Sequence, residues 1–209
     1  LFALERGEQL KAEATRMVDQ AMERAVSMAL VDAQRPEDYD RAGLQSALLQ
    51  QFLVSADDLT DAARTPTADR MIAAAKEAGH AAFGRKIEYL QDFARQVGVP
   101  DVDAQVLSTV MLTVLDEKWK DHLYDLDQLR NAIQYRAYGQ RDPLVEYKKE
   151  AFEMFEDLMR DVHATFTERF LKIQVTAEAP RLPVQPLRAP RAEQAEAAQE
   201  LVDKLKINI

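Results

Sequence analysis

The chain contains no cysteine among its 209 residues, and only 6 glycines and 8 prolines. The absence of cysteine excludes disulfides, thiolate metal sites and catalysis by a thiol. No stretch reaches about 18 uncharged apolar residues, so we expect no segment to span a bilayer. Basic residues are in the minority, with 27 Lys and Arg against 36 Asp and Glu and a formal net charge of −9. That balance argues against broad binding to nucleic acid or to an anionic membrane, although a local basic patch is compatible with it.

Apolar residues make up 47% of the chain and charged residues 30%, which is typical of a globular protein with a core. Helix-favouring residues dominate, and no segment alternates apolar and polar residues as a strand does. The sequence therefore predicts an all-α fold. Because the chain starts at Leu1 and no signal-peptide pattern follows, we expect a segment of a larger intracellular protein.

The first half of the chain predicts one long helix and a smaller helical unit. Residues 1–32 carry apolar side chains three and four positions apart, the pattern of an amphipathic helix, until Pro36 interrupts it. Residues 33–100 predict three further helices. The first two lie near residues 44–53 and 55–64. The third starts at Thr65-Pro66 or at Thr67 and ends at Gly98.

The strongest helical signal lies in residues 103–173, where two apolar series keep three- or four-residue spacing. The first is Leu107, Met111, Leu115, Trp119, Leu123, Leu126, Leu129 and Ile133, and the second is Phe152, Phe155, Met159, Val162, Phe166, Phe170 and Ile173. Gly139 is suited to end the first helix, and Asp142 with Pro143 to begin the second. A short loop between two long helices predicts an antiparallel hairpin. Trp119, inside the first series, is expected to pack in the core.

The end of the chain, residues 176–209, predicts a linker and a terminal helix. Four of the prolines fall between residues 180 and 190, in a linker expected over 174–190. Helix-favouring residues return at 191–207, and that helix either docks on the rest of the chain or stays free of it.

One fragment has the glycine spacing of a phosphate-binding loop but not its context. Residues 79–86 read GHAAFGRK, with Arg85 at the position of the loop's lysine and Lys86 at that of its Ser or Thr. No strand precedes the fragment and helix-favouring residues flank it. We therefore expect an ordinary helix here.

A second fragment raises a metal site as an alternative, because His122 lies among three aspartates. On a helix, only His122 with Asp125, or Asp121 with Asp125, share a face, and a polar surface beside Trp119 accounts for them. No nucleophile, base and orienting group can be assembled from the spacing. We predict no catalytic residue, no bound metal and no enzymatic activity for this chain.

The turn between the two long helices is the one candidate contact site. Five basic residues stand against two acidic ones between residues 130 and 149. Tyr138, beside Gly139, either folds back over the helix end or projects as an exposed aromatic contact. The spacing leaves both readings open and predicts a helical lever whose tip is aromatic and basic.

Four runs of residues in the hairpin resemble, in the same order, the SecA family of bacterial preprotein translocase ATPases. They are 114–123 (VLDEKWKDHL), 129–133 (LRNAI), 135–143 (YRAYGQRDP) and 146–155 (EYKKEAFEMF). The resemblance is dense over about 105–175 and looser but collinear over 1–104. It implies that residues 1–32 end the long helical-scaffold helix, 33–100 form the helical wing domain, and 101–175 form the scaffold's two-helix finger. Residues 176–209 match nothing in the family.

The resemblance also implies a function. In the family, the finger inserts toward the SecY channel and its tip tyrosine contacts the translocating polypeptide. Tyr138 occupies that position, and the surrounding loop is Ala137, Gly139, Gln140 and Arg141. We therefore expect this chain to supply scaffold, wing and finger to the motor that moves preproteins through the SecYEG channel. The alternative is a free-standing helical adaptor that binds other proteins and has no role in translocation.

The resemblance further implies that ATP and Mg²⁺ bind in upstream nucleotide-binding domains, and that this chain holds no cofactor or metal. The parent protein would be an ATP-hydrolysing translocase. Expected partners are an unfolded preprotein, the SecYEG channel and the upstream domains, and nucleic acid is not expected. The expected location is the cytoplasm, at the inner face of the bacterial plasma membrane.

Overall fold

A computed structural model describes residues 2–31, 35, 38–55, 67–136, 142–176 and 206–208 of the chain. Within these residues the helices are α1 (Phe2–Leu30), α2 (Arg41–Phe52), α3 (Ala68–Val97), α4 (Val102–Arg136) and α5 (Pro143–Lys172). Two three-residue strands, β1 (Gln174–Thr176) and β2 (Lys206–Asn208), pair antiparallel, with Val175 opposite Ile207. The predicted all-α class is confirmed, with this small strand pair as an addition.

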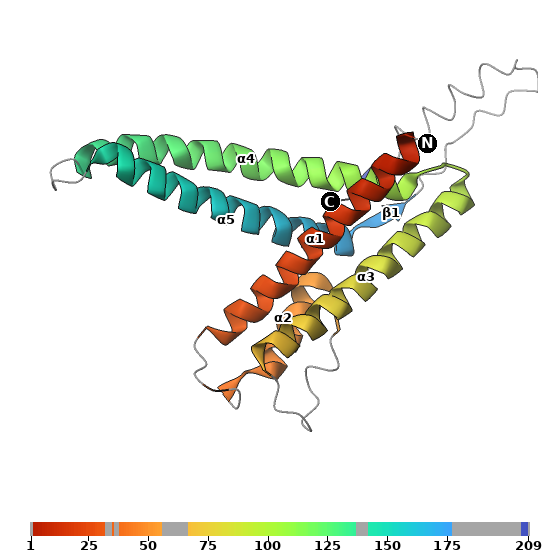
Figure 1. Cartoon of the computed structure of the whole chain (residues 1–209). Coiled ribbons are helices and arrows are strands. Elements are labelled where there is room, and N and C mark those ends of the chain that lie inside the picture. The colour runs from red at the N-terminus through yellow and green to blue at the C-terminus, as the bar shows by residue number, and fades with distance from the viewer. Residues whose placement is uncertain are drawn as a thin grey trace, which may run out of the picture.

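The helices form two arms that share a base (Figure 1). In one arm α1 and α3 lie side by side, and α2 packs against α1. In the other, α4 and α5 run antiparallel as a long hairpin. Helix α1 contacts α5 as well as α3, so it joins the two arms.

Local sequence signals set the helix ends where the structure describes them. The side chain of Thr67 accepts a hydrogen bond from a backbone N–H in the first turn of α3, and Gly98 ends that helix in the left-handed conformation. Asp142 accepts a bond of 2.9 Å from the backbone N–H of Leu144, and Pro143 occupies the first turn of α5. The start of α3 at Thr67, one of the two predicted, is thus confirmed, as are its end at Gly98 and the predicted start of α5.

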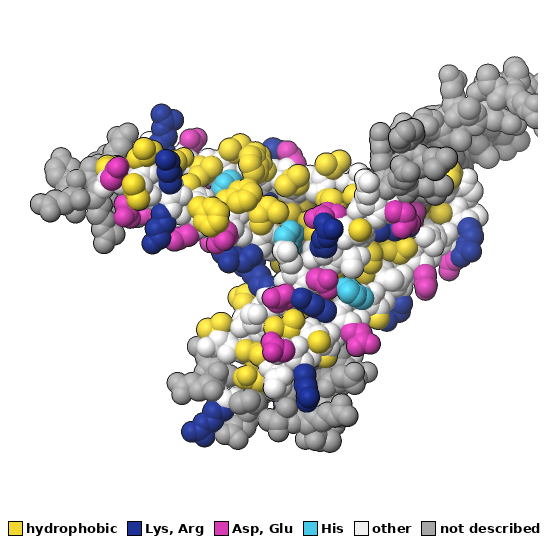
Figure 2. All heavy atoms as spheres, viewed as in Figure 1, with side chains coloured by type: hydrophobic (Ala, Val, Ile, Leu, Met, Phe, Trp, Pro, Cys, Tyr) yellow, Lys and Arg dark blue, Asp and Glu magenta, His cyan; other side chains and the backbone are white. Residues whose placement is uncertain are grey.

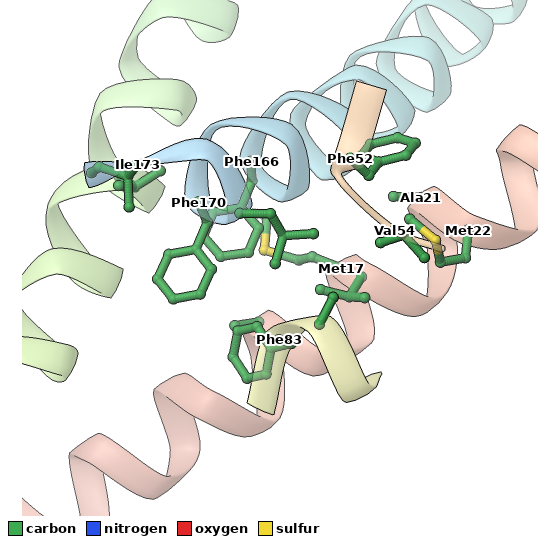
Figure 3. Close-up of a cluster of buried hydrophobic side chains, with 14 of the residues drawn as sticks. Met17, Ala21, Met22, Phe52, Val54, Phe83, Phe166, Phe170 and Ile173 are labelled. Atoms are coloured by element: carbon green, nitrogen blue, oxygen red, sulfur yellow. The ribbon is translucent and has the colours of Figure 1, made fainter. Parts of the chain in front are cut away.

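A single hydrophobic core joins all of the described helices at the shared base. Figure 3 shows Met17 and Ala21 of α1, Phe52 at the end of α2, Phe83 of α3 and Phe170 of α5 converging on one cluster. The ring of Phe170 lies 5.3 Å from that of Phe83, between centroids. It also stacks on Phe166 at 5.7 Å. Because these side chains come from both arms, they fix the hairpin to the rest of the fold.

The expectations for the end of the chain are wrong where the structure describes it. Residues 174–176, expected in a linker, form β1, and residues 206–207, expected in a helix, belong to β2. Ile173 and Val175 are buried while Gln174 and Thr176 are exposed, an alternation too short to stand out in the sequence. The helix expected at 55–64 and the interval 177–205 lie outside the described residues, apart from Ser55.

Candidate functional site: a two-sided helical hairpin

The hairpin of α4 and α5 is held at its base and extends away from the core. Helix α4 has 35 residues and α5 has 30, which at a rise of about 1.5 Å per residue makes α5 roughly 45 Å long. Near the base, one side of each helix is buried in the shared core. Farther out, Leu129 and Ile133 of α4 are buried along the hairpin. The hairpin is therefore a stiff rod with one anchored end.

Polar contacts reinforce this anchor. Arg24 of α1 pairs with Asp161 of α5 at 2.8 Å, and Lys11 of α1 pairs with Asp103 of α4 at 3.0 Å. Burial acts to raise the pKa of the Asp103 carboxyl, but hydrogen bonds from Gln91 of α3 and from Lys11 outweigh it and hold that pKa below its usual value. Asp103 thus stays ionised where three helices meet.

One side of the rod is apolar, and the described part of the chain leaves it exposed. We call it the apolar face, and it consists of Leu112, Leu115, Trp119 and Leu123 of α4 with Phe152, Phe155 and Met159 of α5, all exposed. Figure 2 shows hydrophobic side chains gathered along this arm. The expectation that Trp119 packs in the core is wrong, since 44% of its surface is exposed. An apolar surface of this extent is typical of a contact site for another polypeptide.

A groove of about 210 Å³ lies between α4 and α5. We call it the acidic groove, and its lining is Lys118, Asp121, His122, Asp125, Met154, Asp157, Leu158 and Asp161. Asp121 and Asp125, two of the three aspartates that the sequence singled out, thus line the groove together with two aspartates of α5 that sequence reasoning missed. Among the described residues, no group of histidines and carboxylates has an arrangement suited to a metal ion.

The predicted tip residues lie outside the described part of the chain. They are Ala137, Tyr138, Gly139, Gln140 and Arg141, between the end of α4 and the cap of α5. Their role stays a prediction. Residues 79–86, by contrast, lie within helix α3, which agrees with the rejection of a phosphate-binding loop.

His163 of α5 is buried in the core at the base of the hairpin, with 8% of its surface exposed. Its Nδ1 atom has no hydrogen-bond partner among the described residues. Burial lowers the pKa of this imidazole below its ordinary value of 6.5, although the carboxylate of Glu13 on α1 acts in the opposite direction. The structure therefore favours the neutral form.

We expect the free energy of unfolding to fall as the pH drops through 6.5, the ordinary histidine value. The unfolded chain then binds a proton at His163 that the folded chain excludes, so the stability from this group is complete above that pH and is lost below it. For one proton the slope is at most about 1.4 kcal/mol per pH unit. Urea unfolding between about pH 7.5 and 5.5 measures it.

The matched variants for this measurement are His163→Gln and His80→Gln. His80 is half-exposed beside Asp19, so its replacement should leave the contribution of His163 in place. His163→Gln should flatten the pH dependence. Equal slopes in His163→Gln and in the natural chain would show that His163 does not carry the effect.

Comparison with known proteins identifies the family to which this fold belongs. Residues 3–174, from the start of α1 to β1, match the family model described as the SecA Wing and Scaffold domain. The chain belongs to the SecA family. The match covers both arms, so the SecA assignment does not depend on the hairpin alone.

Several relatives named protein translocase subunit SecA align with this chain. The one from Endomicrobium trichonymphae is 30% identical over 81% of this chain and 19% of that protein. The one from Solibacter usitatus is 33% identical over 85% of this chain and 17% of that protein. The one from Gluconobacter oxydans is 47% identical over 41% of this chain and 9% of that protein. The chain thus spans less than a fifth of the length of these SecA proteins.

Proposed function

We propose that this chain is the scaffold, wing and finger portion of an ATP-driven motor that moves preproteins through the SecYEG channel. In this proposal residues 1–32 end the scaffold helix, 33–100 form the wing and 101–175 form the finger. The observation that carries it is a hairpin anchored at one end, with an exposed apolar face, in a chain of the SecA family.

The geometry suits a lever that transmits movement. Because the base of α5 shares its core with α1 and α3, a rotation of those helices would carry the whole rod with it. Over a rod of roughly 45 Å, a rotation of about 10° moves the tip by roughly 8 Å. Exposed apolar and aromatic side chains grip a passing chain weakly, whatever its sequence.

In this proposal the chemistry of ATP and Mg²⁺ takes place elsewhere in the parent SecA protein, in nucleotide-binding domains upstream of this segment. The partners would be those domains, an unfolded preprotein and the SecYEG channel, at the inner face of the plasma membrane. Within the described ranges, no helix combines the length and hydrophobicity needed to cross a membrane.

Crosslinking tests the finger directly, because this chain has no cysteine of its own. Tyr138→Cys is placed as the only thiol in a full-length, cysteine-free SecA that contains this segment. A stalled preprotein carries the second thiol. Tyr124→Cys, on the exposed shaft of α4, is the matched control. We expect the Tyr138→Cys variant to form a disulfide with the preprotein only when ATP and the channel are present. The Tyr124→Cys variant should form at least several-fold less of this crosslinked product.

Adducts that form equally at both positions, or at neither, would contradict the finger role of this hairpin. The free-standing adaptor would then be the better explanation of the apolar face. Sedimentation of the isolated chain with candidate partner proteins would be the next measurement in that case.

A further inference from the structure

The acidic groove is a built site that the lever function does not use. Its lining comes from both helices of the hairpin, with Asp121, His122 and Asp125 on α4 facing Asp157 and Asp161 on α5. The groove lies wholly within residues that the structure describes. A ligand could therefore bind in this groove whether or not the hairpin acts as a translocation finger.

The carboxylates of the two helices differ in their state of pairing. On α5, Asp157 pairs with Arg160 at 2.6 Å and Asp161 pairs with Arg24 at 2.8 Å. On α4, Asp121 and Asp125 have no ion-pair partner in the described part of the chain. These two are one helical turn apart, so they present two unneutralised carboxylates on one face.

A second observation points to a ligand. His122 lines the groove with 7% of its surface exposed, and it has no hydrogen-bond partner among the described residues. Its ring packs against Trp119 at 5.8 Å and Phe155 at 6.2 Å, between centroids. The ring nitrogens are not among the fully buried unpaired atoms of the described residues, so they reach solvent at the groove, where a polar group of a ligand could replace water.

The remaining lining residues define the shape of the ligand. Met154 and Leu158 give the groove an apolar side on α5, which suits an aliphatic stem rather than a bare ion. Lys118 also lines the groove and borders a second hollow beside α1 and α2, so it lies at the end nearest the base. Its ammonium makes no ion pair within the described residues, so it leaves the carboxylates of Asp121 and Asp125 to an incoming cation.

We propose that the acidic groove receives one arginine side chain from a partner protein. The guanidinium would donate to Asp121 and Asp125, and its aliphatic stem would lie on Met154 and Leu158. A planar guanidinium reaches two separate carboxylates and stacks on ring surfaces, which a compact ammonium does less well. A volume of about 210 Å³ admits one such side chain and not a folded segment.

The test uses the 209-residue chain and N-acetyl-arginine amide as the probe. Trp119 is the only tryptophan and lies against His122, so its fluorescence reports on the groove, and the His122 ring protons give a second signal by NMR. We expect saturable changes in both, with half-saturation at millimolar concentrations. N-acetyl-citrulline amide, which is neutral, should give none.

Charge-matched variants of α4 distinguish binding in the acidic groove from a general effect of the negative charge of the chain. Asp121→Asn with Asp125→Asn should weaken binding of the arginine probe about tenfold. Asp116→Asn with Asp127→Asn removes the same two charges from exposed positions outside the groove and should leave binding unchanged. Lys118→Gln should tighten binding, because it removes a positive charge that repels the guanidinium at the groove.

Three results would overturn the proposal. The first is a change in the Trp119 and His122 signals with sodium chloride that equals the change with the arginine probe at the same ionic strength. The second is equal weakening in both double variants, which would indicate net charge alone. The third is a saturable response to magnesium chloride that exceeds the response to the arginine probe, which would make the groove a cation site. None of these depends on ATP or on the channel, so failure here is separate from failure of the crosslinking test.

Discussion

Replacing Phe170 by Ala should lower the free energy of unfolding by about 3–5 kcal/mol, the usual cost of removing a buried phenylalanine. Phe170 is fully buried and its ring contacts Phe166 of α5 and Phe83 of α3. The substitution therefore opens a cavity at the joint between the two arms. Urea unfolding followed by circular dichroism measures the loss.

The matched control is Phe152→Ala, the same substitution on the same helix. Phe152 belongs to the apolar face and 62% of its surface is exposed, so the expected change is within about 0.5 kcal/mol. A loss at Phe152 as large as that at Phe170 would mean that the apolar face is covered in the isolated chain, for example by a second copy.

Replacing Gly79 by Leu should lower the free energy of unfolding by about 3 kcal/mol, at the upper end of the cost of overpacking. A Cβ atom at this position would lie 2.9 Å from Cγ of Met22 and 3.0 Å from Cγ1 of Val18. Glycine therefore allows α3 to approach α1 closely. A leucine would force the helices of this arm apart.

Gly84→Leu is the control for this prediction, because Gly84 also lies in α3 but a Cβ there meets nothing within 4 Å. It should raise stability by about 0.5–1 kcal/mol, since leucine is the better helix former. Thermal unfolding of the Gly79→Leu and Gly84→Leu variants under the same conditions measures the difference in stability. If Gly79→Leu were as stable as Gly84→Leu, the close approach of α1 and α3 would be contradicted.

These contrasts show why a regular apolar series did not reveal which residues are buried. Phe152, Phe155 and Met159 continue the spacing of Phe166 and Phe170, and Leu115 and Trp119 continue that of Leu107. Sequence periodicity identifies the side of a helix that is apolar, but not how far along the helix another element covers it. At the base α1 and α3 cover the series. Farther out Leu129 and Ile133 are buried along the hairpin, but the residues of the apolar face stay exposed.

The acidic groove is a second feature that the local sequence did not reveal. The sequence placed Asp121, His122 and Asp125 close together on one helix, and a solvated polar surface was the simpler interpretation. Asp157 and Asp161 are more than thirty residues away, so only the antiparallel pairing of α4 with α5 brings them to the same groove. The exact register of two helices depends on the packing of their side chains, which local spacing does not specify.

The sequence by itself determined the helical class, the ends of α3, the start of α5 and the antiparallel hairpin. Each of these depends on interactions within a few residues, such as the caps at Thr67 and Asp142 and the left-handed Gly98. Only the tertiary structure decided that Trp119 is exposed, that His163 is buried and that an acidic groove lies between α4 and α5. Those properties depend on which surfaces pack together in the fold. Packing between distant segments of the chain decides this, whereas the conformational preferences of neighbouring residues do not.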